Sequence, residues 1–255
     1  MNPFKYGCVV DGENFCARRD AELQLRRFAE SGQNVVVQGA RRMGKSSLVR
    51  KAISEMRGAI QLQPNVPYFF LGSVRHDMMS IFSSPQSPFF KSAAAFEVDA
   101  IDQKDFTAFI VRRFSAGHRK ISAETAARLI GFADSVSGDV QELCAALWET
   151  TEANSLITEN DVPLALEHIF ARERKGFEKS ISRLTPTQIA VLKGIAAVDD
   201  AKIYSSRFLE SIRIPSTGTV KKAVKRLTED ELVYEWQRSW RFVDPFFREW
   251  VRRKI

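Results

Sequence analysis

Eight residues near the start of the chain combine glycines, a lysine and a serine in a spacing suited to holding phosphate groups. They read Gly-Ala-Arg-Arg-Met-Gly-Lys-Ser at positions 39–46. Glycines let backbone N–H groups approach a phosphate chain closely, and a helix that follows the loop adds its dipole. Lys45 would bring a positive charge to the terminal phosphates, and the hydroxyl of Ser46 is the expected ligand of a bridging Mg²⁺ ion. The predicted nucleotide-binding residues are Gly39, Arg42, Met43, Gly44, Lys45, Ser46 and Ser47.

The segments around this loop carry the patterns expected of a parallel sheet with helices. Residues 34–38 form a β-branched run bounded by glycine, which is typical of a buried parallel strand. Residues 46–56 place apolar side chains at helical intervals, and residues 20–30 read as an amphipathic helix. Residues 66–71 and 93–98 are predicted to be two further strands. The loop is therefore expected to join a strand to a helix in an α/β domain with a small parallel sheet.

The acidic residues that normally accompany such a loop do not follow a predicted strand here. An ATPase of this class holds Mg²⁺ and polarises water with an acidic pair at the end of a core strand. The strand at 66–71 ends in Gly72 and Ser73, and the nearest acid beyond it is Asp77. Glu97 and Asp99 flank Val98 and fit the pattern poorly. The sequence thus predicts nucleotide binding and leaves hydrolysis open.

Beyond residue 104 the patterns become helical. Residues 105–176 predict an all-α lid, with one apolar face formed by Phe106, Phe109, Ile110 and Phe114. Residues 177–255 predict three helices, at 185–197, 204–212 and 216–227, and then a hairpin around residues 238–239, which is the order of a winged helix. The expected organisation is a nucleotide-binding core at 1–104, a lid at 105–176 and a winged-helix domain at 177–255.

Positive charge is concentrated in the last of these domains. Residues 1–176 hold 22 Lys and Arg against 21 Asp and Glu, whereas residues 177–255 hold 16 against 10. In the third helix of the winged helix, apolar residues recur at i, i+3, i+4 and i+7, and the opposite face is basic. The candidate DNA-binding residues on that face are Lys221, Lys222, Lys225 and Arg226. Contact with a protein or within the chain is an equally open use of the module, whose aromatic residues are expected to form its core.

The remaining composition indicates an ordinary folded protein. Hydrophobic residues make up 44% and charged residues 27% of the 255 positions, and no apolar stretch reaches the length of a membrane helix. The start of the chain lacks the apolar core of a signal peptide, so the expected location is the cytoplasm. Cys8, Cys16 and Cys144 show no CxxC spacing and predict neither a disulfide framework nor a zinc site.

Motifs along most of the chain resemble the prokaryotic AAA+/STAND-type ATPases of the archaeal-ATPase group, in which a P-loop domain precedes a helical lid and a winged helix. The segments that carry the resemblance are NPF at 2–4, FCARRDAEL at 15–23, GARRMGKSSL at 39–48, YFFLGSVRHDM at 68–78, SPFF at 87–90, SGDVQELCAALW at 137–148 and DPFFREW at 244–250. The resemblance implies ATP with Mg²⁺, and makes Ser73 the candidate sensor of the γ-phosphate. It also places the lid around Gly138 and Gln141 over the adenine, although the proline common after that glycine is not present.

One departure from this family affects the catalytic residues. In the family, two more strands lie between the P-loop helix and the sensor strand, and the second carries the acidic Walker B residues. Here ten residues, 55–64, separate the two elements. The sequence therefore predicts a narrower sheet of three parallel strands.

Three functions remain open at this stage. The first is a switch in which ATP and Mg²⁺ binding repositions the lid and the winged helix. The second is an active ATPase whose acid is Asp77, Asp99 or a residue of a neighbouring subunit. The third is a winged-helix regulator that binds double-stranded DNA and carries a vestigial P-loop domain. Partners other than ATP, whether DNA, another protein or a second copy of the chain, are not identified by the sequence.

Overall fold

The chain divides into two compact units, Met1–Val162 and Pro163–Ile255, which are described separately. A computed structural model describes residues 2–10, 12–39, 42–54, 69–71, 82, 84–86, 90–91, 93–198, 201–236 and 238–255. The expected boundary at residue 176 falls inside a continuous helix, α8 (Val162–Ser182). Within the described residues, no helix is both long enough and apolar enough to cross a membrane.

The first unit contains a small sheet made of three parallel strands. They are β1 (Val35–Gln38), β2 (Phe69–Leu71) and β3 (Ala94–Glu97), in the spatial order β2-β1-β3. Val36 of the central strand pairs with Phe70 on one side and with Ala95 on the other. The prediction of three parallel strands is confirmed for the described part of the chain. β2 lies directly beside β1, the strand that precedes the glycine-rich loop.

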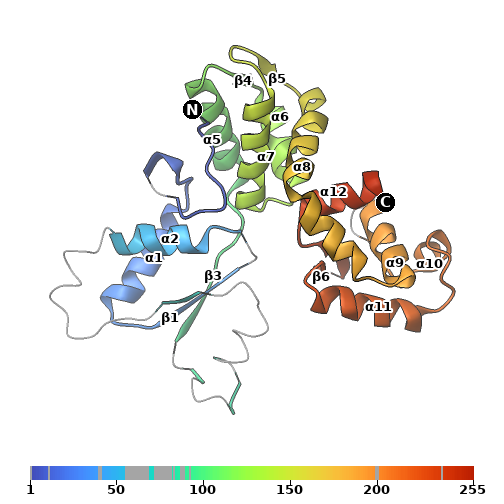
Figure 1. The fold of residues 1–255 in the computed structure, drawn as a ribbon. Helices are drawn as coiled ribbons and strands as arrows, with labels where there is room; N and C mark the ends of the chain where they lie inside the picture. The colour runs from blue at the N-terminus through green and yellow to red at the C-terminus, as the bar shows by residue number, and fades with distance from the viewer. Residues whose placement is uncertain are drawn as a thin grey trace. The chain divides into compact units, whose positions relative to one another are not determined.

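Two helices cover one face of this sheet, as Figure 1 shows: α1 (Arg19–Glu30) and α2 (Lys45–Ser54). The helices bury a stripe of apolar side chains because their apolar residues recur at helical spacing. Leu25 of α1 and Leu48 of α2 are fully buried against Val35 and Val37 of β1. Phe96 and Val98 extend the same core to the end of β3. This core fixes the ends of β1 and α2, between which the glycine-rich loop runs.

The rest of the first unit is helical, as expected for a lid. Its main helices are α5 (Gln103–Ala116), α6 (Ala123–Phe132) and α7 (Ser137–Thr150). β4 (Lys120–Ile121), between α5 and α6, pairs in parallel with β5 (Leu156–Ile157), which follows α7. Two short 3-10 helices also belong to this unit: η1 (Gly12–Asn14) precedes α1, and η2 (Glu159–Asp161) precedes α8. The predicted apolar face of α5 is confirmed, since Phe106, Phe109, Ile110 and Phe114 are all buried.

The first residues of the chain are bound to this helical region. The ring of Phe4 lies 4.5 Å from the ring of Phe114, and the side-chain amide of Asn2 donates to the carbonyl oxygen of Ala145 at 3.1 Å. The guanidinium of Arg113 donates through Nε to the carbonyl oxygen of Pro3 at 3.0 Å. The N-terminal segment is thereby held against α5 and α7.

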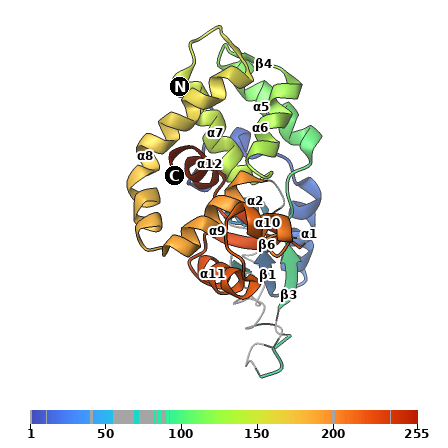
Figure 2. The same cartoon turned by 90° about the vertical axis from the view of Figure 1, so that its right-hand side faces the viewer.

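The second unit has the predicted winged-helix order. After α8 come α9 (Pro186–Ala197), α10 (Ser206–Ser211), α11 (Thr217–Glu229), β6 (Val233–Trp236), β7 (Ser239–Phe242) and α12 (Pro245–Lys254). Figure 2 shows α9, α10 and α11 grouped beside the hairpin strand β6. The strands β6 and β7 pair antiparallel, with Val233 opposite Phe242. The final helix, α12, was not predicted, although Asp244 caps it by accepting from Phe246 N and Phe247 N.

Aromatic side chains form the centre of the second unit. Phe177, Phe247 and Trp250 contact one another with ring centroids 5.1 to 6.1 Å apart. Phe242 and Phe246 are also buried, so the expectation that these aromatic residues form the core is confirmed for the four residues Phe242, Phe246, Phe247 and Trp250. The apolar face of α11 is confirmed as well, since Val220, Ala223, Val224 and Leu227 are buried.

Candidate functional site

The glycine-rich loop lies between β1 and α2, as predicted. β1 ends at Gln38 and α2 begins at Lys45, with Leu48 N donating to the carbonyl oxygen of Gly44 at 3.0 Å. Gly39 has φ +148°, and a Cβ atom added there would lie 2.7 Å from the carbonyl oxygen of Val98. Glycine is therefore required where the loop leaves β1 and passes the end of β3. Gly44 has φ +77°, a backbone conformation that favours glycine at the start of α2.

Lys45 bridges the two ends of the loop. Its Nζ donates to the carbonyl oxygen of Gly39 at 2.9 Å, so the ammonium group lies within the turn of the loop. Burial, and in second place the charge of Arg18, lower the pKa of Lys45. A charged group in such surroundings is stabilised by an anion. Lys45 is thus placed to bind phosphate.

The two serines after Lys45 differ in their surroundings. Ser46 is exposed, which leaves its hydroxyl accessible to a metal ion or a nucleotide. Ser47 is buried, and its Oγ accepts from Val10 N at 3.0 Å. The roles of Ser46 as a Mg²⁺ ligand and of Ser47 as a nucleotide contact remain predictions. The hydrogen bond from Val10 shows that Ser47 also holds the N-terminal segment. Met43, a residue of the loop itself, is buried, with 7% exposure.

Arg18 is a site residue that was not predicted. It precedes α1 in a left-handed conformation, with φ +86°. Both terminal nitrogens, Nη1 and Nη2, are buried and have no hydrogen-bond partner among the described residues. Burial lowers the pKa of Arg18. The charges of Cys16 and Asp99 act in the opposite direction, and their effect is smaller. Its charge also acts on Lys45. Two cations therefore share one partly buried region at the loop, and an anion of high charge is the ligand that both would favour.

Arg42 occupies the other side of the loop and is directed at helix α7. It adopts φ +64°, and its guanidinium forms ion pairs with Asp139, at 2.6 Å, and with Glu142. Backbone contacts run between the same segments, because Gly138 N donates to the carbonyl oxygen of Arg42 at 2.9 Å and Ser137 Oγ donates to that oxygen at 3.2 Å. The loop and the start of α7 are thus joined through both the side chain and the backbone of Arg42.

Two predicted site residues, the sensor candidate Ser73 and the acid candidate Asp77, lie outside the described part of the chain. So do Ala40 and Arg41 of the loop, which were not among the predicted nucleotide-binding residues. The other acid candidate, Asp99, is described. It is exposed and follows Val98, whose N donates to the carbonyl oxygen of Gln38 at 2.6 Å beside Gly39. Asp99 therefore lies at the end of β3 that faces the loop.

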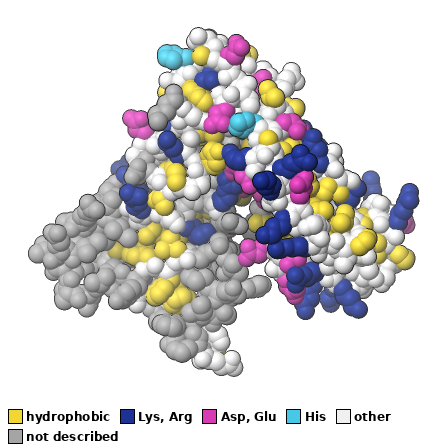
Figure 3. All heavy atoms as spheres, in the orientation of Figure 1, with side chains coloured by type: hydrophobic (Ala, Val, Ile, Leu, Met, Phe, Trp, Pro, Cys, Tyr) yellow, Lys and Arg dark blue, Asp and Glu magenta, His cyan; other side chains and the backbone are white. Residues whose placement is uncertain are grey.

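In the second unit, the four predicted basic residues of α11 are all exposed. They differ in their ion pairs. Arg226 pairs with Asp230 at 2.9 Å, and Lys225 lies 3.9 Å from Glu229. Lys221 and Lys222 have no acidic partner among the described residues. Figure 3 shows Lys and Arg side chains gathered along the lower right edge, where Figure 1 places α11. The first half of α11 therefore carries the uncompensated charge.

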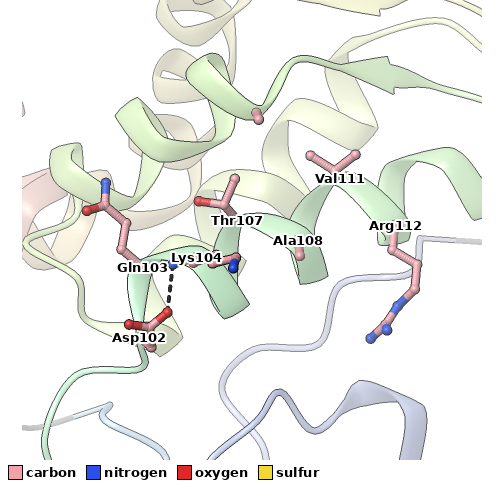
Figure 4. Close-up of a pocket in the computed structure, with 8 residues that line it drawn as sticks. Asp102, Gln103, Lys104, Thr107, Ala108, Val111 and Arg112 are labelled. Carbon is pink, nitrogen blue, oxygen red and sulfur yellow. Dashed lines mark hydrogen bonds between the residues drawn. The ribbon is translucent and has the colours of Figure 1, made fainter.

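A separate open pocket of about 790 Å³ lies along helix α5. It is lined by Thr107, Ala108 and Val111 of α5 together with Lys104 and Arg112, and Figure 4 shows the Thr107 and Val111 side chains on one side of the helix. The acid among its lining residues, Asp102, caps α5 by accepting from Lys104 N at 2.9 Å. The one acid that lines this pocket is therefore committed to the helix cap.

Comparisons with known proteins identify a winged helix from the sequence and a similar fold over nearly the whole chain. A family model described as a probable winged helix domain matches residues 175–253. The structure is similar to a Walker-type ATPase of Pyrococcus abyssi, with a TM-score of 0.68 and 13% identity over 98% of this chain and 99% of that chain. It also matches the RuvB Holliday junction branch migration motor of Thermotoga maritima, with a TM-score of 0.43 and 13% identity over 90% and 93% of the two chains. A search among curated protein sequences finds no match.

The chain therefore has a P-loop NTPase-like fold with a short parallel sheet, a helical region and a C-terminal winged-helix domain. The identity to the Pyrococcus protein is low, so that similarity concerns the fold.

Proposed function

We propose that this protein binds ATP with Mg²⁺ at the glycine-rich loop and acts as a nucleotide-gated switch of the AAA+/STAND type. The observation that carries the proposal is the arrangement of two cations at the loop. Nζ of Lys45 donates to the carbonyl oxygen of Gly39, and Arg18 brings to the same region two buried nitrogens that have no hydrogen-bond partner among the described residues. A triphosphate supplies the negative charge and the acceptor oxygens that these groups favour.

The remaining loop residues fit the same ligand. Gly39 and Gly44 keep the backbone free of side chains at the two ends of the loop, where N–H groups would approach a phosphate. The exposed hydroxyl of Ser46 is the residue that would hold Mg²⁺, which would bridge the phosphates and neutralise their charge. On helix α7, Gln141 is buried and its Oε1 has no hydrogen-bond partner among the described residues, which suits an amine donor such as that of adenine.

Thermal unfolding with and without MgATP tests this function. We expect ATP to raise the unfolding midpoint of the wild-type chain, by an amount that increases with ATP concentration. The variant Lys45→Ala should lose this response, since the cation inside the loop is removed. An unchanged midpoint of the wild type at millimolar MgATP would reject the nucleotide-binding function.

Hydrolysis is a second candidate activity, and the position of Asp99 favours it. This acid follows β3 at the end that faces the loop, and its charge acts on Arg18. Asp99 is therefore the candidate catalytic acid among the described residues. Phosphate release above a Lys45→Ala control would show turnover, and its loss in Asp99→Asn with retained ATP binding would assign the acid. Turnover that is unaffected by Asp99→Asn would exclude this residue.

DNA binding is a third candidate, favoured by the uncompensated charge on α11. In winged-helix modules the third helix enters the major groove, with its N-terminal residues nearest the bases. Lys221 and Lys222 lie there, whereas Lys225 and Arg226 are paired with acids. We expect salt-dependent duplex binding to weaken more in Lys221→Ala/Lys222→Ala than in Lys225→Ala/Arg226→Ala. Equal binding by wild type and both double variants would exclude α11 as the contact helix.

A further inference from the structure

The contacts of Arg42 raise a question about the loop itself. An arginine inside a phosphate-binding loop has two obvious uses: it contacts the nucleotide directly, or it holds the loop in shape. In this protein the guanidinium is directed at α7, a helix that starts about a hundred residues later in the sequence. Its side chain is 30% exposed, whereas its partners Asp139 and Glu142 are 3% and 5% exposed.

The packing around this pair is close. A Cβ atom added at Gly138 would lie 2.7 Å from the Cβ atom of Arg42 and 2.9 Å from its carbonyl oxygen. That same oxygen accepts hydrogen bonds from Gly138 N and from Ser137 Oγ. The left-handed backbone of Arg42 is unfavourable for a residue with a side chain, and such a conformation persists when surrounding contacts determine it. The start of α7 supplies those contacts.

From this geometry we infer that Asp139 and Glu142 are positioning residues for the nucleotide site and act through Arg42. By holding Arg42, they fix the part of the loop that leads from Arg42 into α2 and leave phosphate contact to Lys45 and Arg18. This inference rests on the proposed binding of ATP at the loop. It extends the functional site to two acids of the helical region, neither of which contacts the nucleotide.

Charge and geometry together direct Arg42 at α7. Nη2 of the guanidinium donates a charge-assisted hydrogen bond to Glu142, and Nη1 forms an ion pair with Asp139, so two nitrogens of one rigid group contact two acids. Both acids are buried, so the loss of Arg42 would remove a compensating positive charge from two buried carboxylates.

The test compares ATP affinity in variants on the two sides of the contact. Asp139→Asn/Glu142→Gln removes both negative charges with little change in shape, and Arg42→Met removes the guanidinium. We expect each to raise the Kd for MgATP at least about tenfold, and the triple variant to bind no more weakly than either. Kd is measured well below the unfolding midpoint of each variant, so that loss of folded protein does not contribute.

A matched control is available in the same unit. Arg128 also pairs with two acids, Glu124 and Glu159, but all three are exposed and lie on α6 and η2. Glu124→Gln/Glu159→Gln should therefore leave the Kd for MgATP unchanged. Arg42→Lys keeps the charge, but its single ammonium nitrogen cannot reproduce the contacts that two guanidinium nitrogens make with Asp139 and Glu142. We expect this variant to bind MgATP more weakly than wild type and more tightly than Arg42→Met.

The result that would overturn the inference is unchanged or tighter ATP binding by Asp139→Asn/Glu142→Gln. Tighter binding would mean that the released guanidinium contacts the phosphates directly. Effects of the two sets of substitutions that add in the triple variant would likewise show that they act independently. If the wild-type chain does not bind MgATP, the proposed function itself fails, and the role of the two acids in nucleotide binding fails with it.

Discussion

Replacement of Arg18 by methionine is expected to move stability and ATP binding in opposite directions. The guanidinium holds two buried nitrogens without a partner among the described residues, and its charge opposes that of Lys45. In the absence of nucleotide, both features destabilise the folded state. With ATP bound, the same nitrogens would donate to phosphate oxygens. Methionine is a long side chain without charge. The variant therefore removes both the destabilisation of the nucleotide-free protein and the hydrogen bonds to ATP.

The magnitudes follow from ordinary values for such groups. A buried donor without a partner costs about 1 to 3 kcal/mol, which corresponds to about 2 to 10 °C in the unfolding midpoint of a domain of this size. Charge-assisted hydrogen bonds to phosphate contribute about 1.5 to 3 kcal/mol, so Arg18→Met should weaken ATP binding by about 10 to 100-fold. At an ATP concentration of about 100 times the wild-type Kd, a 30-fold loss reduces the stabilisation from about 2.7 to about 0.9 kcal/mol.

Differential scanning fluorimetry with and without MgATP measures both quantities on one sample. Arg19→Met is the matched control, because Arg19 is the next residue, is exposed and begins α1. It should change neither the midpoint nor the response to ATP by more than a fraction of the Arg18→Met effect. A variant Arg18→Met that unfolds at a lower temperature than wild type, or that responds fully to ATP, would refute this account of Arg18.

Three further predictions concern the same unit. Gly39→Ala should abolish ATP stabilisation, because a Cβ atom would lie 2.7 Å from a carbonyl oxygen and displace the loop; retained binding in a titration would contradict this. Burial raises the pKa of the Cys16 thiol to about 12 and also raises the pKa of Cys144, so at pH 8 both stay protonated. Alkylation followed by mass spectrometry should therefore modify the exposed Cys8 alone in the native chain and all three cysteines in denaturant; rapid native labelling of Cys16 would be inconsistent with its burial. Asp102→Ala should lower the free energy of unfolding by about 1 kcal/mol through loss of the α5 cap, and a denaturant titration showing no change would count against the capping contact.

Local sequence patterns predicted much of the fold. The β-branched run before Gly39 and the apolar spacing after Lys45 predicted the strand and the helix that hold the loop, because burial of one face follows directly from such patterns. The same holds for α11, whose four predicted apolar positions are buried. The final helix α12 was not predicted, although Asp244 and Pro245 are ordinary helix-start signals. Its aromatic residues were interpreted only as part of the core.

The glycine-rich loop, the strand and helix on either side of it, and the basic face of the third helix of the winged helix could all be predicted from the sequence alone. These depend on residues close together in the chain, whose spacing is set by the geometry of helices and strands. Tertiary structure decided which charges meet at the loop. Arg18 reaches Lys45 from before α1, and Asp139 and Glu142 hold Arg42 from α7, about a hundred residues away. No local pattern encodes such contacts, because they depend on how α1 and α7 pack around the ends of β1 and α2.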